Sequence, residues 1–379
     1  MDNLLHILMM LINFNTTSPA NDESFLFLKP ILEKMGFVCE LHHADDMKVS
    51  NMIATLTLND SGKILAYSGH LDIVPINIDS KYDQLKMTID DQDNVYGRGT
   101  VDMKGSIAAF IVAVDEYLKS DIVKNQQNIG KIIFLLSGDE ETNSFGIKKI
   151  LPLLPKNIDT CIVGEPTSDN QVGDNIKVGR RGSINIKLKI NGIGGHIAYP
   201  QFTSNPIFIL AKIITDLKAL EIDKGTAYFQ PTNLEISNIT TSNTKDINNI
   251  IPEEATASIN IRYNILQTSE KLLKIIEDTV KQYTNSYEIT YKISGDPFLT
   301  NMSSNAVTTM VDCIYNIAKI KPKITTDGGT SEARFLYKYV DNIFEIGLLN
   351  KTAHKNNEHT TINDLNTLKD IYLEYLKKY

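Results

Sequence analysis

Hydrophobic and polar residues alternate along the first part of this chain in blocks that are typical of an α/β protein. Apolar runs at residues 63–67, 131–136 and 159–163 have the length of strands that are buried on both faces. Between the first two runs, residues 107–114 form an apolar stretch that predicts a helix. Strands that alternate with helices predict a layered unit, with a mixed, mainly parallel sheet flanked by helices.

The pattern changes after Arg180-Arg181-Gly182. Strict alternation of apolar and polar residues, which is typical of half-exposed strands, appears at residues 183–190, 232–236 and 255–262. Helices and one more strand are expected at about 206–220, 270–283 and 288–293. These segments predict an α+β unit whose sheet has one open face.

Buried helix and strand patterns return from about residue 296. A chain of 379 residues is also too long for one typical core. We therefore expect one α/β domain formed by residues 1–181 and 296–379, and an α+β domain inserted at residues 182–295.

The charge and the cysteines narrow the possible partners and compartments. A formal net charge of −8 without any block of Lys and Arg argues against a nucleic-acid partner. Cys39, Cys161 and Cys313 are scattered without a C-x-x-C pair, which indicates a reducing compartment. We expect a cytoplasmic protein.

The apolar segment at residues 4–12 raises the question of a signal peptide. Asp2 stands where signal peptides carry basic residues, and no small-residue cleavage site follows. The segment is also far too short to span a bilayer. We expect a buried amphipathic helix here and no membrane partner.

The first candidate for chemistry is the pair His70 and Asp72. Two residues that are two apart on an extended segment point to the same side. This geometry suits a metal-binding imidazole that a carboxylate holds from behind. A solvated strand end is the other interpretation, and this segment alone leaves both open.

Further acidic residues and one histidine follow predicted strands or precede a predicted helix, where open α/β sheets place their ligands: Asp102, Glu140, Glu141, Glu165 and His354. Like charges at close range raise one another's pKa, so a cluster of carboxylates without a cation is costly. A pair of divalent ions removes that cost, and imidazole with carboxylate suits zinc. Asp102 could bridge the two ions, and Glu140 and Glu141 could divide the roles of base and ligand.

The sequence does not support either of two nucleotide-binding alternatives to a metal site. Gly97-Arg98-Gly99 resembles the start of a dinucleotide fingerprint, but Asp102 stands where the third glycine belongs, and no phosphate-binding P-loop motif occurs. His196 follows two glycines outside the sheet domain without a nearby carboxylate motif. From the residues alone it is a structural histidine, unless a second subunit brings it to the site.

Four ordered motifs resemble those of the M20 family of co-catalytic zinc hydrolases: Ser-Gly-His-Leu-Asp-Ile-Val-Pro at 68–75, Tyr-Gly-Arg-Gly-Thr-Val-Asp-Met-Lys-Gly at 96–105, Gly-Asp-Glu-Glu at 138–141 and Val-Gly-Glu-Pro-Thr at 163–167. The resemblance covers essentially the whole chain. It implies a di-zinc catalytic domain and an inserted dimerisation domain. Segments 179–183, 248–252, 328–335 and 354–358 are similar to the succinyl-diaminopimelate desuccinylase branch of that family.

The resemblance implies a role for each matching residue. His70 and Glu165 would bind one zinc, Glu141 and His354 the other, and Asp102 would bridge them. Asp72 would orient His70. Glu140 would take a proton from the bridging water and later give it to the leaving amine. Cobalt is a possible substitute for either zinc.

The resemblance also implies how substrate and partner bind. His196 matches the residue that reaches across a homodimer to stabilise the oxyanion, which reverses the interpretation made from the residues alone. The positions expected to hold the carboxylates of a small-molecule substrate are Arg181, Asn249, Arg262, Thr330 and Arg334, with Arg180 as the alternative to Arg181. Leu71 stands where the family often has threonine.

The expected reaction is the hydrolysis of N-succinyl-LL-2,6-diaminopimelate to succinate and diaminopimelate. The alternatives are another M20 deacylase or metallopeptidase, similar to acetylornithine deacetylase or a carboxypeptidase, and a metal-binding dimer that has lost catalysis. The full ligand set together with Glu140 argues against the last of these.

Overall fold

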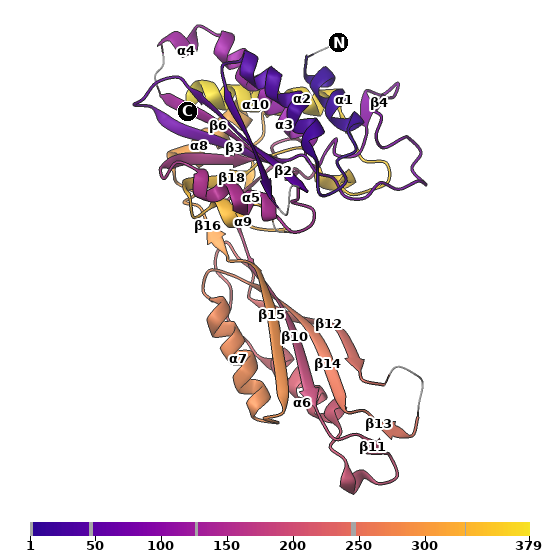
Figure 1. Ribbon diagram of the computed structural model, residues 1–379. Helices are drawn as coiled ribbons and strands as arrows, with labels where there is room; N and C mark the ends of the chain where they lie inside the picture. The colour runs from indigo at the N-terminus through magenta and orange to yellow at the C-terminus, as the bar shows by residue number, and fades with distance from the viewer. Residues whose placement is uncertain (1–2, 45–47, 126–127, 244–247, 330) are drawn as a thin grey trace. The chain divides into compact units, whose positions relative to one another are not determined.

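The structure is a computed structural model that describes residues 3–44, 48–125, 128–243, 248–329 and 331–379. The chain divides into two compact units, which are described separately (Figure 1). Unit 1 consists of Met1–Gly179, Thr300–Thr325 and Ser331–Tyr379, and unit 2 consists of Arg180–Leu299 and Thr326–Thr330.

Unit 1 is built on an eight-stranded sheet with the strand order β1-β2-β6-β3-β7-β18-β8-β17. Its strands are β1 (Val38–Ala44), β2 (Val49–Thr57), β3 (Lys63–His70), β6 (Ile129–Ser137), β7 (Ile158–Val163), β8 (Asn175–Lys177), β17 (Lys323–Thr325) and β18 (Val340–Glu345). The central strand β3 pairs in parallel with both β6 and β7, and β7 pairs in parallel with β18. The predicted mixed, mainly parallel sheet is confirmed.

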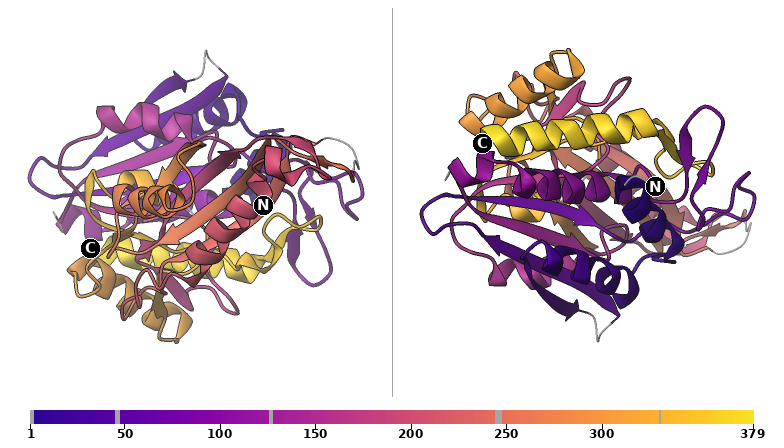
Figure 2. Two further views of the ribbon diagram at one scale, coloured as in Figure 1. Left: turned by 90° about the horizontal axis from the view of Figure 1, so that it is seen from below. Right: turned by 90° about the horizontal axis from the view of Figure 1, so that it is seen from above.

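Helices flank this sheet: α1 (Asn3–Asn13), α2 (Asp22–Lys34), α3 (Lys104–Lys119), α4 (Ile122–Asn125), α5 (Phe145–Ile150), α8 (Asn305–Ala318), α9 (Ala333–Leu336) and α10 (Ile362–Lys378), with short 3-10 turns η1 (Leu151–Leu153) and η3 (Asn350–Thr352). Helix α3 packs against β3 and lies beside α1 and α10 (Figure 2). Since neighbours cover it on several sides, most of its residues are buried, including the continuous apolar run at residues 107–114. Among the described residues, no helix is long and apolar enough to cross a membrane.

A three-stranded sheet completes unit 1, with the order β19-β5-β4. Its strands are β4 (Thr88–Ile89), β5 (Asn94–Tyr96) and β19 (His359–Thr361). His359 pairs with Tyr96 in an antiparallel register. This sheet therefore brings the loop after β5, which leads to Asp102, next to the segment that contains His354.

His42 and His43 extend the strand β1 beyond the apolar pattern of residues 37–41. They lie inside β1, where His42 pairs with Asn51 and His43 with Ser50. Strand β1 is at the edge of the sheet, and an edge strand tolerates polar side chains that a central strand does not. The apolar pattern therefore ended before the strand did.

Unit 2 contains a four-stranded antiparallel sheet with the order β12-β14-β10-β15. Its elements are β10 (Gly182–Asn191), β11 (Gly195–His196), η2 (Pro200–Phe202), α6 (Pro206–Ala219), β12 (Asn233–Thr241), β13 (Ile250–Ile251), β14 (Glu254–Tyr263), α7 (Ser269–Lys281) and β15 (Tyr287–Gly295). Two short strands, β9 (Gly179–Arg180) and β16 (Phe298–Leu299), lie where the sequence passes from one unit to the other.

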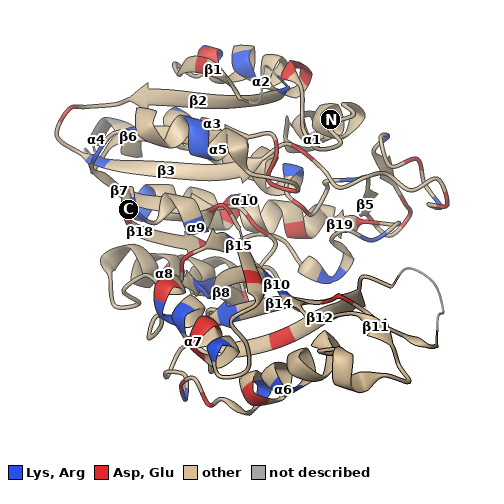
Figure 3. Cartoon of the chain, turned by 60° about the horizontal axis from the view of Figure 1, so that its bottom comes forward, with Lys and Arg blue, Asp and Glu red and all other residues tan. Residues whose placement is uncertain are grey.

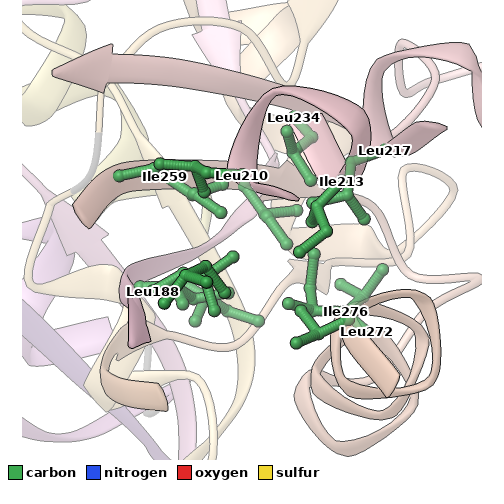
Figure 4. Packing of buried hydrophobic residues seen from close by; sticks show 14 of the residues in the cluster. Leu188, Leu210, Ile213, Leu217, Leu234, Ile259, Leu272 and Ile276 are labelled. Carbon is green, nitrogen blue, oxygen red and sulfur yellow. The ribbon is translucent and has the colours of Figure 1, made fainter. Parts of the chain in front are cut away.

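The core of unit 2 is apolar and follows the predicted alternation. Every second residue of β14 is buried. The buried side chains of the sheet meet those of α6 and α7, including Leu188, Ile213 and Ile276 (Figure 4). Helix α7 itself carries charged residues of both signs along its length (Figure 3). One face of the helix therefore closes the core, and its charged residues occupy the rest of its surface.

Candidate active site

The candidate site lies at one edge of the sheet of unit 1. Strand β3 ends at His70, which pairs with Ser137 at the end of the parallel strand β6. Because β7 is also parallel to β3, the carboxyl ends of all three strands meet at this edge. The segments that follow β6 and β7 there carry the acidic residues Glu140, Glu141 and Glu165.

Asp102 lies between two imidazoles. Its Oδ1 is 3.0 Å from Nε2 of His70, and its Oδ2 is 3.1 Å from Nε2 of His354. Nε2 of His354 is also 3.0 Å from Oε1 of Glu141. Single ligand atoms of His70, Asp102 and Glu141 all lie within 4.8 Å of one another. A carboxylate that offers one oxygen to each side has the arrangement of a bridging ligand.

Asp72 connects two parts of the site. Nδ1 of His70 lies 2.9 Å from the main-chain oxygen of Asp72 and 3.5 Å from its carboxylate. The same carboxylate accepts hydrogen bonds from the backbone N–H groups of Glu140, at 3.1 Å, and Glu141, at 3.0 Å. The buried Asp72 thus orients the imidazole and also fixes the turn that carries the two glutamates.

Glu165 reaches the edge because Gly164 precedes it. A Cβ atom at Gly164 would lie 2.0 Å from the hydroxyl oxygen of Tyr67, so no larger residue fits without displacing the core. Burial raises the pKa of the Glu165 carboxyl well above its usual value, and the negative charge of Asp102 adds to that effect.

The two imidazoles are strongly basic in this setting. Hydrogen bonds to Asp102 and Glu141 raise the pKa of His354 to about 10 against the opposing effect of burial. Burial alone would lower the pKa of His70, but its contacts with Asp102 and Asp72 outweigh burial and raise it well above the usual value. Conversely, burial would raise the pKa of Asp102, but the bonds from His354 and His70 lower it.

The donor set fits a pair of divalent ions. It offers two imidazoles and three carboxylates on a sheet edge, without a thiolate, and this chemistry suits zinc or a similar ion. One ion would have His70 and Glu165 as its own ligands, the other Glu141 and His354, with Asp102 available to both. Ligands bind a metal in their deprotonated form, so metal binding and proton release are coupled here.

Glu140 differs from its neighbour Glu141, because its side chain takes no part in the contacts with His70 and His354 described above. Burial raises its pKa to about 7, while the positive charges of His70 and Arg334 oppose that rise. Nη1 of Arg334 is 4.0 Å from Oε1 of Glu140. A carboxyl with a pKa near neutrality can both accept and return a proton, as a general base in hydrolysis must.

The remaining predicted site residues are divided between the units. Arg334 lies in unit 1, where its Nη2 donates to Oγ of Ser144 at 3.0 Å. Unit 2 contains four of the others: Arg181, His196, Asn249 and Arg262. Thr330 lies outside the described residues. Arg180, the alternative to Arg181, is buried in unit 2 and donates to the main-chain oxygen of Asp327.

His196 is exposed in the short strand β11. Its Nδ1 accepts a hydrogen bond from the backbone N–H of Ala198 at 3.1 Å. The neutral ring therefore has its proton on Nε2, so that this atom is a donor.

Sequence reasoning gave no role to several buried charged residues near the site. Oε2 of Glu332 accepts a hydrogen bond from Ser137 at 2.7 Å, and burial raises the pKa of Glu332 to about 8. Arg98 and Glu358 form a buried ion pair of 2.9 Å. Their presence inside the conspicuous motifs at 96–105, 328–335 and 354–358 was the signal that could have found them.

Comparisons with known proteins show the family of this chain. The model of peptidase family M20/M25/M40 matches residues 66–378. The chain is 40% identical over 377 residues to a succinyl-diaminopimelate desuccinylase from Ehrlichia canis, covering 97% of this chain and 96% of that protein. It is 39% identical over 378 residues to the protein of the same name from Rickettsia bellii, covering 97% and 94%.

Solved structures with low sequence identity share the fold. An M20 family metallo-carboxypeptidase from Sulfolobus solfataricus has a TM-score of 0.78 at 22% identity, covering 100% of this chain and 99% of the other. A dinuclear metal binding peptidase of the M20 family from Bacillus subtilis has a TM-score of 0.71 at 13% identity, covering 99% and 97%.

Proposed function

Because this chain belongs to peptidase family M20/M25/M40 and is a hydrolase, we propose that it cleaves N-succinyl-LL-2,6-diaminopimelate to succinate and LL-2,6-diaminopimelate. This reaction belongs to the biosynthesis of diaminopimelate and lysine. The observation that carries the substrate is the identity of about 40% with desuccinylases over 97% of the chain. The clustered acidic and imidazole groups of unit 1 support the reaction class.

We assign two zinc ions to each subunit. His70 and Glu165 would hold one, Glu141 and His354 would hold the other, and Asp102 would be shared by both, in agreement with its position between the two imidazoles. When bound, such ions polarise the amide carbonyl and make a water molecule a stronger nucleophile near neutral pH. Cobalt is a second candidate, because the same nitrogen and oxygen donors accept it.

Glu140 acts as the general base and then as the general acid. It accepts a proton from the water molecule that attacks the succinyl carbonyl carbon. When the carbon–nitrogen bond breaks, it returns that proton to the departing amine. Its pKa of about 7 supports both steps. Asp72 holds the turn that carries Glu140 through the two backbone hydrogen bonds.

The substrate's carboxylates explain the candidate arginines in a protein with a net charge of −8. We assign Arg181, Asn249, Arg262, Thr330 and Arg334 to these carboxylates, because guanidinium groups bind carboxylates through paired hydrogen bonds. Arg334 is the member of this set in unit 1, at 4.0 Å from Glu140.

We also propose a homodimer in which His196 of one subunit serves the site of the other and stabilises the oxyanion through its Nε2 proton. Unit 2 has exposed apolar side chains that a second copy could cover. Phe208 on α6 is 69% exposed, and Ile239 on β12 is 55% exposed. Contact with a second copy of this chain would remove these apolar side chains from water, which is favourable.

A direct comparison of substrates tests the proposed activity. The zinc-reconstituted protein should hydrolyse N-succinyl-LL-2,6-diaminopimelate with a kcat/KM far above that for N-acetylornithine or simple dipeptides. Faster hydrolysis of either comparison substrate would reassign the chain to another deacylase or peptidase of the family. Failure to hydrolyse any of them with both ions bound would favour a metal-binding protein without catalysis.

A further inference from the structure

Arg98 and Glu358 form an ion pair in the interior of unit 1. Nη1 of Arg98 lies 2.9 Å from Oε2 of Glu358, and the two side chains are 3% and 1% exposed. Burying two charges is expensive, and an apolar pair of similar size often stabilises a fold at least as well. A buried pair next to a ligand cluster therefore calls for a role beyond stability.

The pair connects the two loops that carry Asp102 and His354. Oε1 of Glu358 accepts hydrogen bonds from the backbone N–H groups of Val101, at 2.8 Å, and of Asp102 itself, at 3.1 Å. Nη1 of Arg98 also donates to the main-chain oxygen of Lys355, the residue after His354, at 3.1 Å. Each member of the pair thus holds the loop that contains the other member.

His354 needs such support. Its φ of +61° lies in the left-handed region, which residues with a Cβ atom rarely adopt. A residue keeps such a conformation only where its surroundings enforce it. The bond from Arg98 to Lys355 fixes the chain directly after this unfavourable residue, while the backbone N–H of Gly97 donates to the main-chain oxygen of Glu358 at 3.2 Å.

We propose that Arg98 and Glu358 are positioning residues that hold the carboxylate of Asp102 against the imidazole of His354 and so set the affinity of the second metal ion. That ion is the one assigned to Glu141 and His354. The ion assigned to His70 and Glu165 depends less on the pair, because His70 is the last residue of β3 and Glu165 closely follows β7 in the main sheet. The inference rests on the proposed metal assignment but not on the proposed substrate.

The test is a titration of the metal-free protein with Zn²⁺ in competition with a chromophoric chelator. The wild-type protein should bind two ions. In Glu358→Gln, one of the two ions should lose about 10- to 100-fold in affinity, the range typical of partners that orient metal ligands. The other ion should change much less. The double variant Arg98→Met/Glu358→Gln should bind the affected ion no more weakly than the single variant with the lower affinity. The reason is that the two side chains act as one unit.

Arg98→Lys provides a milder variant in case Glu358→Gln folds poorly. It keeps the positive charge but lacks the rigid guanidinium that reaches both Glu358 and Lys355, so the same ion should again be weakened. Asp223→Asn is the matched control in unit 2. Its carboxylate also accepts backbone hydrogen bonds, from Gly225 and Thr232. This variant should lower the melting temperature and leave both metal affinities unchanged.

Two results would overturn the inference. Unchanged affinity for both ions in Glu358→Gln, with only a lower melting temperature, would make the pair a structural feature. An equal loss of affinity for both ions would show general destabilisation. Because no substrate is present in the titration, neither result depends on whether the protein hydrolyses the succinyl compound.

Discussion

The two units differ in what they bury. Unit 1 encloses charged side chains that are at most 2% exposed, among them Asp72, Lys104 and Glu332. The core cluster of unit 2 consists of aliphatic side chains, alanines and Tyr263. An interior charge costs free energy unless it is paired or binds a cation, so a group of interior charges in a fold marks a candidate functional site. The contrast therefore places the buried charged cluster of the candidate site in unit 1, whereas the core of unit 2 contributes packing alone.

The largest effect is expected from Glu140→Gln. Loss of the general base should lower kcat by about 10²- to 10⁴-fold. The affinity for both metal ions should be retained, because Glu140 is not among the assigned ligands. Steady-state kinetics and a metal count measure the two properties. Glu23→Gln, at the exposed start of α2, is the control. Activity close to that of the wild type in Glu140→Gln would contradict the assignment of Glu140 as the general base.

His196→Ala asks whether unit 2 contributes chemistry as well as packing. Removal of an oxyanion donor should lower kcat by about 10²- to 10³-fold. If His196 acts across a dimer, mixing this variant with Glu140→Gln should restore activity, because one site of the mixed dimer then has both intact residues. No recovery in dimers shown to have exchanged subunits would contradict the assignment across the dimer.

Leu188→Ala should destabilise unit 2 by about 2–5 kcal/mol, the usual cost of truncating a buried leucine. Leu188 is fully buried in the cluster shown in Figure 4. Amide hydrogen exchange should show the loss in unit 2, with protection of β3, β6 and β7 preserved. Equal loss of protection in both units would mean that they unfold as one, which would weaken the contrast between them.

Glu332 and Asp223 should give the two units opposite pH dependence. Burial raises the pKa of Glu332 to about 8, so the folded state keeps a proton that the unfolded chain loses above about 4. Unit 1 should therefore become less stable as the pH rises from about 4 to 8. Hydrogen bonds from Thr232 and Asn264 overcome burial and lower the pKa of Asp223 to about 2, so that unit 2 loses stability as the pH falls from about 4 to 2.

The pH prediction can be checked on the metal-free protein by hydrogen exchange corrected for its intrinsic pH dependence. Glu332→Gln should flatten the trend in unit 1 alone, and Asp223→Asn should flatten the trend in unit 2 alone. A trend that either variant leaves unchanged would belong to other groups.

The sequence predicts those features of the fold that local pattern determines. The apolar runs of β3, β6 and β7 and the alternation of β10 and β14 indicate both sheets, and acidic residues after the strands indicate a metal site. The pattern does not show that Asp72 also fixes the turn of Glu140, since that contact joins different strand ends. Nor does it distinguish the buried Glu358 from an exposed glutamate, because burial depends on packing between distant segments.

The most direct test of the account is to restore metal to the protein while following hydrolysis of N-succinyl-LL-2,6-diaminopimelate. The metal-free protein should be inactive, and turnover should increase as Zn²⁺ fills the cluster formed by His70, Asp102, Glu141, Glu165 and His354. Under the same conditions, Glu140→Gln should bind the ions, with kcat lowered by about 10²- to 10⁴-fold. Full activity in the presence of a strong chelator, or no activity with the cluster filled, would contradict the account.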